Sequence, residues 1–391
     1  MAALEYWLWL SAADVGPRAK TALVQCFGDA EQAFHAPNGA FFHVPGVSKQ
    51  EARILEKRDV SVSERILADC EEQKLQILTL QDARYPARLR NIPAPPVVLY
   101  VKGTLPDVDR EAVVALIGTR RASEYGRRMG RELAMQIGCG GGVVLSLLTA
   151  GVDEEVAKGA LRAHCGLIGV LGTPIEGEKT FLARDVAEKG ALVSEYPPGT
   201  RAQKRFFRER NRVAAGLSIG VVVVEAPEKS GALLFADEAA EQGREIFAVP
   251  GNVGETNSVG TLGLLKTGAR LITCGRDVLE DLAPLFPGKL KANAPAPAAE
   301  EDPDEDAEEK KEVDTEKPQG YIDLRTQLQD LDEEELQIIA AIEKGASHMD
   351  DIIDRTGLPT WKVLSKLTKL SIERYLIMRP GKFYELNITK K

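Results

Sequence analysis

The fold is decided by residues 112–138, which read AVVALIGTRRASEYGRRMGRELAMQIG. Val113–Ile117 is a short apolar run, and after Gly118 the apolar residues recur at helical spacing through Arg127–Ile137. A strand that turns sharply into a helix is the repeating unit of α/β proteins. The segment therefore predicts a buried strand followed by a helix.

The same alternation continues along the chain. Strands are predicted at Val113–Ile117, Val143–Ser146, Leu167–Leu171, Ala191–Ser194, Gly220–Glu225, Ile246–Val249 and Arg270–Thr273. Helices are predicted at Arg127–Ile137, Glu154–Ala163, Lys179–Glu188, Gly231–Gln242 and Thr261–Thr267. Near-continuous apolar strands joined by helices favour a parallel, Rossmann-like sheet that is covered on both faces. Such sheets bind ligands at the carboxyl ends of strands, where the strand order reverses.

Four regions are predicted along the chain. Residues 1–80 form a helical module, SAM-like or helix–hairpin–helix-like, because glycine turns at Gly16 and Gly46 each open a helix. Residues 81–288 form the Rossmann-like α/β core. Residues 289–328 are rich in Ala, Pro and acids and predict a disordered linker.

Residues 329–391 predict a winged helix. Three helices are expected at Glu333–Glu343, Met349–Thr356 and Thr360–Leu370, followed by two short strands. Lys362, Lys366 and Lys369 recur on one face of the third helix. This face suits DNA, but the first two helices are acidic, so docking of a protein is an equal alternative.

Composition excludes several classes of protein. No apolar run approaches the ~20 residues that span a bilayer, and Met1–Leu10 lacks the features of a signal peptide. The five cysteines are scattered and form no CxxC motif, which argues for a reducing cytoplasm and against a disulfide framework or a zinc site. No metal and no cofactor are expected.

Charge is distributed unevenly. The net charge of −9 equals the net charge of the acidic run Glu300–Glu316 alone, so the remainder of the chain is balanced. Within that remainder, Arg201–Arg212 has a net charge of +5 and Gly118–Arg131 a net charge of +4. Because local field decides where a polyanion lands, these two basic segments are candidates for binding nucleic acid.

The turn after the first core strand is a candidate phosphate site. Gly118, Thr119, Arg120 and Arg121 offer backbone donors, a helix N-terminus and guanidinium groups, which together can hold phosphate. A tight turn with an exposed arginine is an equal alternative. The loop Gly172–Thr180 resembles a P-loop only in part, because Glu178 displaces Lys179, although Lys179 at a helix start could still touch phosphate.

Arg201–Arg212 interleaves arginines with Phe206 and Phe207. Aromatic faces stack on unpaired bases with ~1–3 kcal/mol per base while arginines neutralise the backbone. We expect one phenylalanine to point inward and the other to lie near the ligand site. The two arginine-bearing segments are predicted to form a single cationic trough that brings Arg120 and Arg212 together.

Catalytic constellations are not evident. No GxGxxG motif and no set of nucleophile, base and acid occur. Asp153 and Glu225 follow predicted strands and could be general acids, ribose ligands, helix caps or ion-pair partners. His164 and Cys165 are read as structural residues.

Six segments together resemble the DNA-processing protein A (DprA/Smf) family. They are YPARLRNIPAPPVVLYVKG, ALIGTRRASEYGRR, SEYPPGT, FFRERNRVAAGLS, VVVVEAPEKSGAL and EQGREIFAVPGN. The resemblance is strong over roughly residues 80–275 and extends more weakly to the helical module and the winged helix.

The resemblance implies a cytoplasmic homodimer that binds single-stranded DNA and is not an enzyme. Such proteins protect incoming DNA in natural transformation and help to load the RecA recombinase. By motif match, Gly118, Thr119 and Arg120 grip phosphate. The basic segment supplies Phe207, Arg210, Asn211 and Arg212, and the next strand end supplies Gly251 and Asn252.

Five positions depart from the family pattern. Leu147, Ala150, Ala157, Phe235 and Leu262 stand where the family has glycine, arginine, histidine, threonine and asparagine. We infer that a small-nucleotide pocket has degenerated, whereas an electrostatic grip on a polynucleotide needs charge more than shape and could survive, weakened or altered. Two rival functions are a phosphoribohydrolase-like nucleotide enzyme and a protein-docking adaptor.

Overall fold

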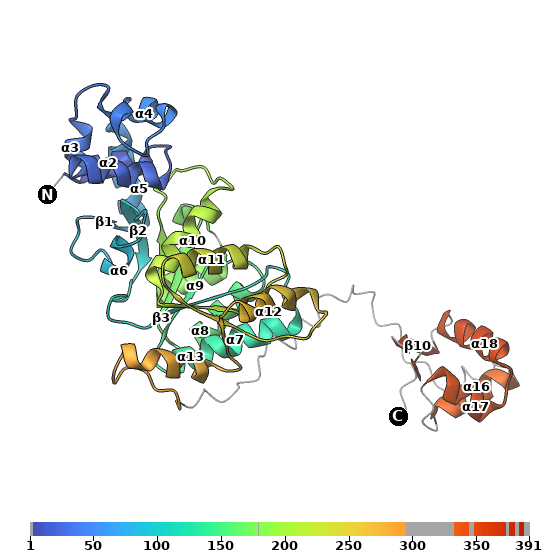
Figure 1. The fold of residues 1–391 in the computed structure, drawn as a ribbon. Coiled ribbons are helices and arrows are strands. Elements are labelled where there is room, and N and C mark those ends of the chain that lie inside the picture. The colour runs from blue at the N-terminus through green and yellow to red at the C-terminus, as the bar shows by residue number, and fades with distance from the viewer. Residues whose placement is uncertain are drawn as a thin grey trace. The chain divides into compact units, whose positions relative to one another are not determined.

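The structure is a computed structural model that describes residues 3–178, 180–294, 332–343, 348–372, 375–379 and 383–386. The chain divides into two compact units, Met1–Glu300 and Glu301–Lys391 (Figure 1). The first unit contains both the helical module and the α/β core. Of the predicted linker, residues 295–328 lie outside the described part.

The helical module is built from short helices around a small apolar core. The helices are α1 (Leu4–Ala12), α2 (Pro17–Phe27), α3 (Ala30–Phe34), η1 (Ala40–His43), α4 (Lys49–Leu55) and α5 (Ser61–Gln73). Trp7 and Trp9 are buried among them. The Gly16 amide donates to Glu51 Oε1 (3.1 Å), so this N–H group is bonded within the helical module.

A nine-stranded sheet forms the core, in the order β1-β2-β6-β5-β4-β3-β7-β8-β9. Its strands are β1 (Gln76–Thr79), β2 (Val98–Gly103), β3 (Val113–Ile117), β4 (Val143–Ser146), β5 (Leu167–Leu171), β6 (Ala191–Ser194), β7 (Gly220–Val223), β8 (Glu245–Ala248) and β9 (Arg270–Leu271). β3 to β9 run parallel, while β1 and β2 pair antiparallel at one edge. All seven predicted strands are present, and β9 is shorter than predicted.

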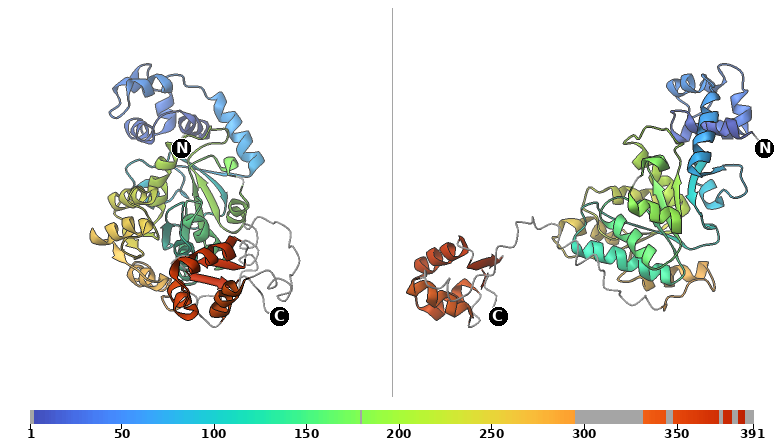
Figure 2. Two further views of the ribbon diagram at one scale, coloured as in Figure 1. Left: turned by 90° about the vertical axis from the view of Figure 1, so that its right-hand side faces the viewer. Right: turned by 180° about the vertical axis from the view of Figure 1, so that it is seen from behind.

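Helices cover both faces of the sheet, as predicted (Figure 2). They are α6 (Ala87–Arg90), α7 (Glu124–Cys139), α8 (Val152–Arg162), η2 (Ile175–Gly177), α9 (Phe181–Lys189), α10 (Phe206–Leu217), α11 (Gly231–Glu241), η3 (Thr256–Ser258), α12 (Val259–Lys266), α13 (Gly275–Leu282) and η4 (Ala283–Leu285). Alternate β3 side chains point to opposite faces. Val114 and Leu116 pack in the core with α7 and α8, whereas Val113 and Ile117 pack in the core with α10 and α11.

The strand order reverses at β3. From β3 the chain adds β4, β5 and β6 on one side, and it then returns to place β7 on the other side of β3. The residues that follow β3 and β7 therefore meet at a topological switch point, where parallel sheets bind ligands.

The second unit is a winged helix. It contains α16 (Glu333–Glu343), α17 (Met349–Thr356), α18 (Thr360–Ile372), β10 (Leu376–Arg379) and β11 (Phe383–Leu386). Ile338, Ile352, Val363 and Leu367 form its core. The predicted order of elements is confirmed. Across both units, none of the described helices combines the length and apolar character that a membrane span requires.

Candidate nucleic-acid interface

A cavity of about 380 Å³ lies at the switch point of the sheet. We call it the switch-point pocket. Its walls come from the carboxyl ends of β3, β4 and β7, from α10 and from the start of α11. The polar and aromatic residues that line it are Thr119, Arg120, Thr149, Asp153, Phe207, Arg208, Arg210, Asn211, Lys229 and Ser230.

The Gly118–Arg121 turn is held by bonds within the protein. The Gly118 amide donates to Asp153 Oδ1 (3.1 Å), and the Thr119 amide donates to the Glu225 carbonyl (2.8 Å). A Cβ atom on Gly118 would lie 2.6 Å from the Val152 side chain, so only glycine fits. The prediction that these backbone amides bind phosphate is therefore wrong for Gly118 and Thr119, and the exposed Arg120 side chain is what the turn presents.

The helix after this turn begins later than predicted. α7 starts at Glu124, with Ser123 as its N-cap. Glu225 accepts from the Ser123 amide (3.0 Å), from the Ser123 hydroxyl and from Asn257 Nδ2 (3.3 Å). In the structure Glu225 anchors this loop, a role that differs from those the sequence left open for it.

Arg210 is a buried cation that lines the pocket. It is 6% exposed, its Nη1 donates to the Leu147 carbonyl (3.1 Å), and its guanidinium lies 5.7 Å from the centre of the Phe207 ring. Burial lowers the pKa of Arg210 to about 10, Asp153 acts against that shift, and Arg120 adds to it. The group therefore stays charged at neutral pH. Its Nε is buried without a hydrogen-bond partner among the described residues, which favours an anion as ligand.

Asp153 is the acid of the pocket. Burial raises the pKa of its carboxyl to about 6, although the Thr149 hydroxyl, Arg210 and the Gly118 amide each lower it. The carboxylate accepts from the Gly118 amide (3.1 Å) and from the Thr149 hydroxyl, and it balances part of the charge of Arg210. Protonation of Asp153 would thus raise the net positive charge of the pocket by one.

The two phenylalanines of α10 point to different sides, one inward and one toward the pocket, as predicted. Phe206 is buried and stacks on Tyr196, with ring centres 3.8 Å apart and planes inclined by 21°. Phe207 is 36% exposed and lines the switch-point pocket. An aromatic ring is therefore present beside the cationic groups.

Arg212 does not reach this pocket. Its side chain is buried, and Nη2 donates to both carboxylate oxygens of Glu195. The prediction of a trough that joins Arg120 to Arg212 is therefore wrong, because Arg212 forms a buried ion pair with Glu195. Arg120 instead shares the pocket with Arg210.

The remaining predicted residues lie apart from the pocket or outside the described residues. Arg121 has an exposed side chain and is not among the lining residues, while its carbonyl accepts from Asn257 Nδ2 (3.0 Å). Gly251 and Asn252 follow β8 and also do not line the pocket. Lys179 lies outside the described residues. Sequence reasoning missed Arg208 and Lys229, although both stand in segments that carried the resemblance.

The five divergent positions do not fill the cavity. Leu147 lines it, while Ala157 and Phe235 are buried in the two cores, Leu262 is half-buried on α12, and Ala150 is exposed. A cavity of about 380 Å³ therefore remains, and of the five positions only Leu147 lies in its wall.

The lysines of α18 in the winged helix are paired internally. Lys362 bonds Glu334 (2.7 Å), while Lys366 and Lys369 both bond Glu335 (3.1 and 2.9 Å). These acids from α16 balance the predicted basic face. Trp361 and Leu364 on the same helix are 68% and 42% exposed.

Comparison with known proteins covers both units. Residues 76–283 match the family described as DNA recombination-mediator protein A, and residues 324–382 match the DprA winged helix domain. A "Protein Smf" from Synechocystis is 29% identical, over 97% of this chain and 98% of its own. A "DNA processing protein DprA" from Bacillus subtilis is 36% identical, over 56% of this chain and 75% of its own. The solved structure of DNA processing protein A from Streptococcus pneumoniae is 28% identical, with a TM-score of 0.63, and covers 72% of this chain and 99% of that one.

Proposed function

Because the chain belongs to the DNA recombination-mediator protein A family, we propose that it binds single-stranded DNA at the switch-point pocket. The observation that supports this most is the grouping of Arg120, Arg208, Arg210 and Lys229 around one cavity. These cations come from three separate parts of the chain, and the fold brings them to one strand-end edge.

The pocket suits a single strand better than a duplex. Phe207 is partly exposed beside the cationic groups, and a ring can stack only on a base that is unpaired. Arg210 lies buried at the pocket wall, so a phosphate must enter the cavity to reach it. A flexible strand can bend into such a cavity, whereas a stiff duplex cannot.

We further propose the biological role that the family resemblance implies. The protein would protect incoming single-stranded DNA during natural transformation and help to load the RecA recombinase, as a cytoplasmic homodimer. The family description as a recombination mediator supports this proposal. Assembly of RecA on DNA, measured with and without the protein, tests the loading step.

We assign no catalytic step to the pocket. Asp153 and Glu225 are the carboxylates that sequence reasoning singled out, and both are bonded to the loops they position. Release of free base from nucleoside monophosphates would overturn this assignment and favour the phosphoribohydrolase-like rival.

The DNA-binding proposal is tested by a gel-shift comparison of single-stranded and duplex DNA at two salt concentrations. Four cations that each neutralise a phosphate predict a slope of log affinity against log salt of about −3, from ~−0.7 per phosphate. Tighter binding of duplex, or affinity independent of salt, contradicts the proposal.

For the winged helix we propose protein docking. The internal pairing of Lys362, Lys366 and Lys369 supports it, because balanced lysines attract a polyanion weakly. Removal of residues 289–391 should abolish partner binding and leave binding of single-stranded DNA intact. If the truncated protein loses affinity for single-stranded DNA, the winged helix contributes to DNA binding and the proposal that it only docks a protein is contradicted.

A further inference from the structure

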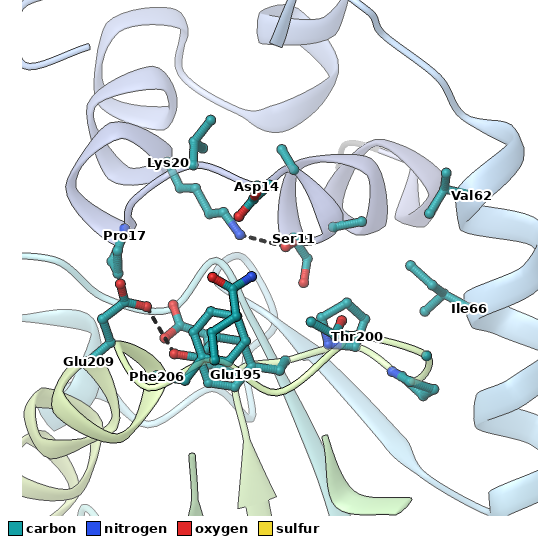
Figure 3. A pocket seen from close by; sticks show the side chains of 18 of the residues that line it. Ser11, Asp14, Pro17, Lys20, Val62, Ile66, Glu195, Thr200, Phe206 and Glu209 are labelled. Atoms are coloured by element: carbon teal, nitrogen blue, oxygen red, sulfur yellow. Dashed lines mark hydrogen bonds between the residues drawn. The ribbon is translucent and has the colours of Figure 1, made fainter. Parts of the chain in front are cut away.

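A second cavity, of about 250 Å³, lies between the helical module and the loop that leads from β6 to α10 (Figure 3). We call it the helical-module pocket. α1, α2 and α5 form one side, and residues 195–206 with Glu209 form the other. None of the functional predictions from the sequence involves this cavity.

A cation and an anion face this cavity with hydrogen-bonding capacity to spare. Lys20 Nζ donates to the Ser11 carbonyl (2.5 Å), its one bond among the described residues, which leaves two of its three donors. Glu209 Oε2 accepts from the Tyr196 hydroxyl (3.0 Å), and no described residue bonds its other oxygen. Figure 3 shows Lys20 and Glu209 approaching from opposite sides.

The charge state of Lys20 suits a donor. Burial lowers the pKa of Lys20 to about 8, Glu195 and Glu209 oppose that shift, and Arg212 and Arg205 add to it. The amine therefore remains mostly protonated at neutral pH. Neighbouring carboxylates balance the positive charge of this amine, so the cavity as a whole does not select for a strongly charged ligand.

The walls of the cavity combine apolar and polar side chains. Besides Lys20 and Glu209, the polar lining residues are Ser11, Asp14, Arg65, Glu195, Thr200, Gln203 and Arg205. Pro197 and Pro198 line it together with Tyr196 and Phe206, whose rings are stacked at 3.8 Å. This apolar part of the lining favours a flat ring. A ring that accepts from Lys20 on one edge and donates to Glu209 on the adjacent edge would use both polar groups.

Guanine has this pattern of groups. Its O6 and N7 accept from lysine, and its N1–H and exocyclic amine present two adjacent donors to a carboxylate. Thymine has a single N–H group between two carbonyls, so a carboxylate meets one donor and an acceptor. Guanine would therefore use both polar groups of the helical-module pocket, whereas thymine would not.

Helix α10 connects this cavity to the switch-point pocket. Phe206 and Glu209 face the helical-module pocket, whereas Phe207 and Arg210 face the switch-point pocket. Around the start of the helix, Arg201, Lys204 and Arg208 are exposed, while the exposed Arg205 is paired with Asp14. Because a helix is only ~10–12 Å across, a strand a few nucleotides long can pass over this basic end and reach both cavities.

We propose that the helical-module pocket binds a guanine base of the same single strand whose phosphates lie in the switch-point pocket. The inference rests on the proposed function, and it adds a base preference to a site that otherwise reads only the backbone. The helical module thereby takes part in DNA recognition.

The test compares two oligonucleotides by fluorescence anisotropy, using the full chain. One is all dT, and the other has dG at every third position, which avoids guanine runs. The unchanged protein should bind the dG-containing strand about fivefold more tightly or better, the low end of discrimination by a good base contact. Lys20→Met and Glu209→Gln should each bring the ratio of the two affinities close to one.

Matched controls are Lys49→Met and Glu64→Gln, which change exposed residues of α4 and α5 that do not line the cavity. Both should keep the ratio of the unchanged protein. Binding of the all-dT strand by the Lys20 and Glu209 variants shows that they are folded. Equal affinity of the unchanged protein for both strands, or a preference that survives both pocket variants, overturns this inference alone. Failure to bind either strand overturns the proposed function instead.

Discussion

Asp153→Asn should remove a pH dependence from DNA binding. Asp153 lies in the switch-point pocket, and burial raises the pKa of its carboxyl to about 6. A bound phosphate repels the carboxylate, so the complex favours the protonated form and its pKa lies higher still. The affinity of the unchanged protein for single-stranded DNA should therefore rise as the pH falls from about 8 to about 5.

The magnitude follows from linkage between protonation and binding. Each unit by which bound DNA raises the pKa of Asp153 adds about tenfold to the affinity gained on acidification. We expect a rise of one to two units, hence about ten- to a hundredfold, because the carboxylate and the phosphate share one cavity of about 380 Å³. In Asp153→Asn the affinity should stay high and nearly constant over this range.

The assay is a fluorescence anisotropy titration of a dT oligonucleotide at fixed ionic strength across this pH range. The difference between the variant and the unchanged protein isolates Asp153 from other titrating groups. Identical pH profiles for the two proteins would refute the reasoning, because the carboxylate would then not face the bound phosphate.

Three further predictions concern stability. The free energy of unfolding should fall by ~3 kcal/mol through Asp153 as the pH rises from about 3 to about 7, because burial raises the pKa of this carboxyl and the native state loses its proton later than the unfolded chain. Urea unfolding of the unchanged protein, compared with Asp153→Asn, measures this change. Arg212→Met should destabilise the fold by ~3–5 kcal/mol in urea, because Glu195 is left buried without its partner, and a loss below about 1 kcal/mol would contradict the ion pair. Trp361→Ala should change the free energy of unfolding of the winged helix by less than ~0.5 kcal/mol, because Trp361 is exposed, whereas Leu367→Ala should lower it by ~2–5 kcal/mol, because Leu367 is buried. Equal shifts in melting temperature for the two variants would contradict the described core.

The strands of the sheet were predictable because burial on both faces leaves an unmistakable pattern. Val113–Ile117 and Leu167–Leu171 are apolar at every position, and the structure has strands at these same residues. β1 was missed because its four residues lie at a sheet edge, where only one of them is buried. An edge strand depends on its partner β2 more than on its own composition.

The orientation of Arg212 could have been read from the sequence. At about 100° per residue, Arg212 lies about 140° from Phe207 around the helix axis, whereas Arg210 lies only about 60° from it, so Arg212 is turned away from the face that carries Phe207. Phe207 and Arg210, three apart, share a face, and the structure places both in the switch-point pocket. The ion pair with Glu195 could not be predicted, because it depends on where the loop after β6 folds back.

The hydrogen-bond partners of the amides in the Gly118–Arg121 turn could not be predicted from the sequence either. A strand followed by a glycine and an arginine suggests free backbone donors. In the structure, the Gly118 amide donates to the Asp153 carboxylate and the Thr119 amide donates to the Glu225 carbonyl, both from other parts of the chain. Likewise, the spacing of Lys362, Lys366 and Lys369 predicted a shared face without showing that α16 supplies the countercharges. In both cases the missing information is tertiary.

The central claim is that the cations of the switch-point pocket hold a single strand. The measurement that tests it most directly is the salt dependence of single-stranded DNA affinity for the unchanged protein, for Arg120→Glu and for the exposed control Arg276→Glu on α13. We predict that Arg120→Glu weakens binding at every salt concentration and makes the slope shallower by at least ~0.7, while Arg276→Glu changes neither. Equal losses in the two variants, or an unchanged slope in Arg120→Glu, would contradict the account.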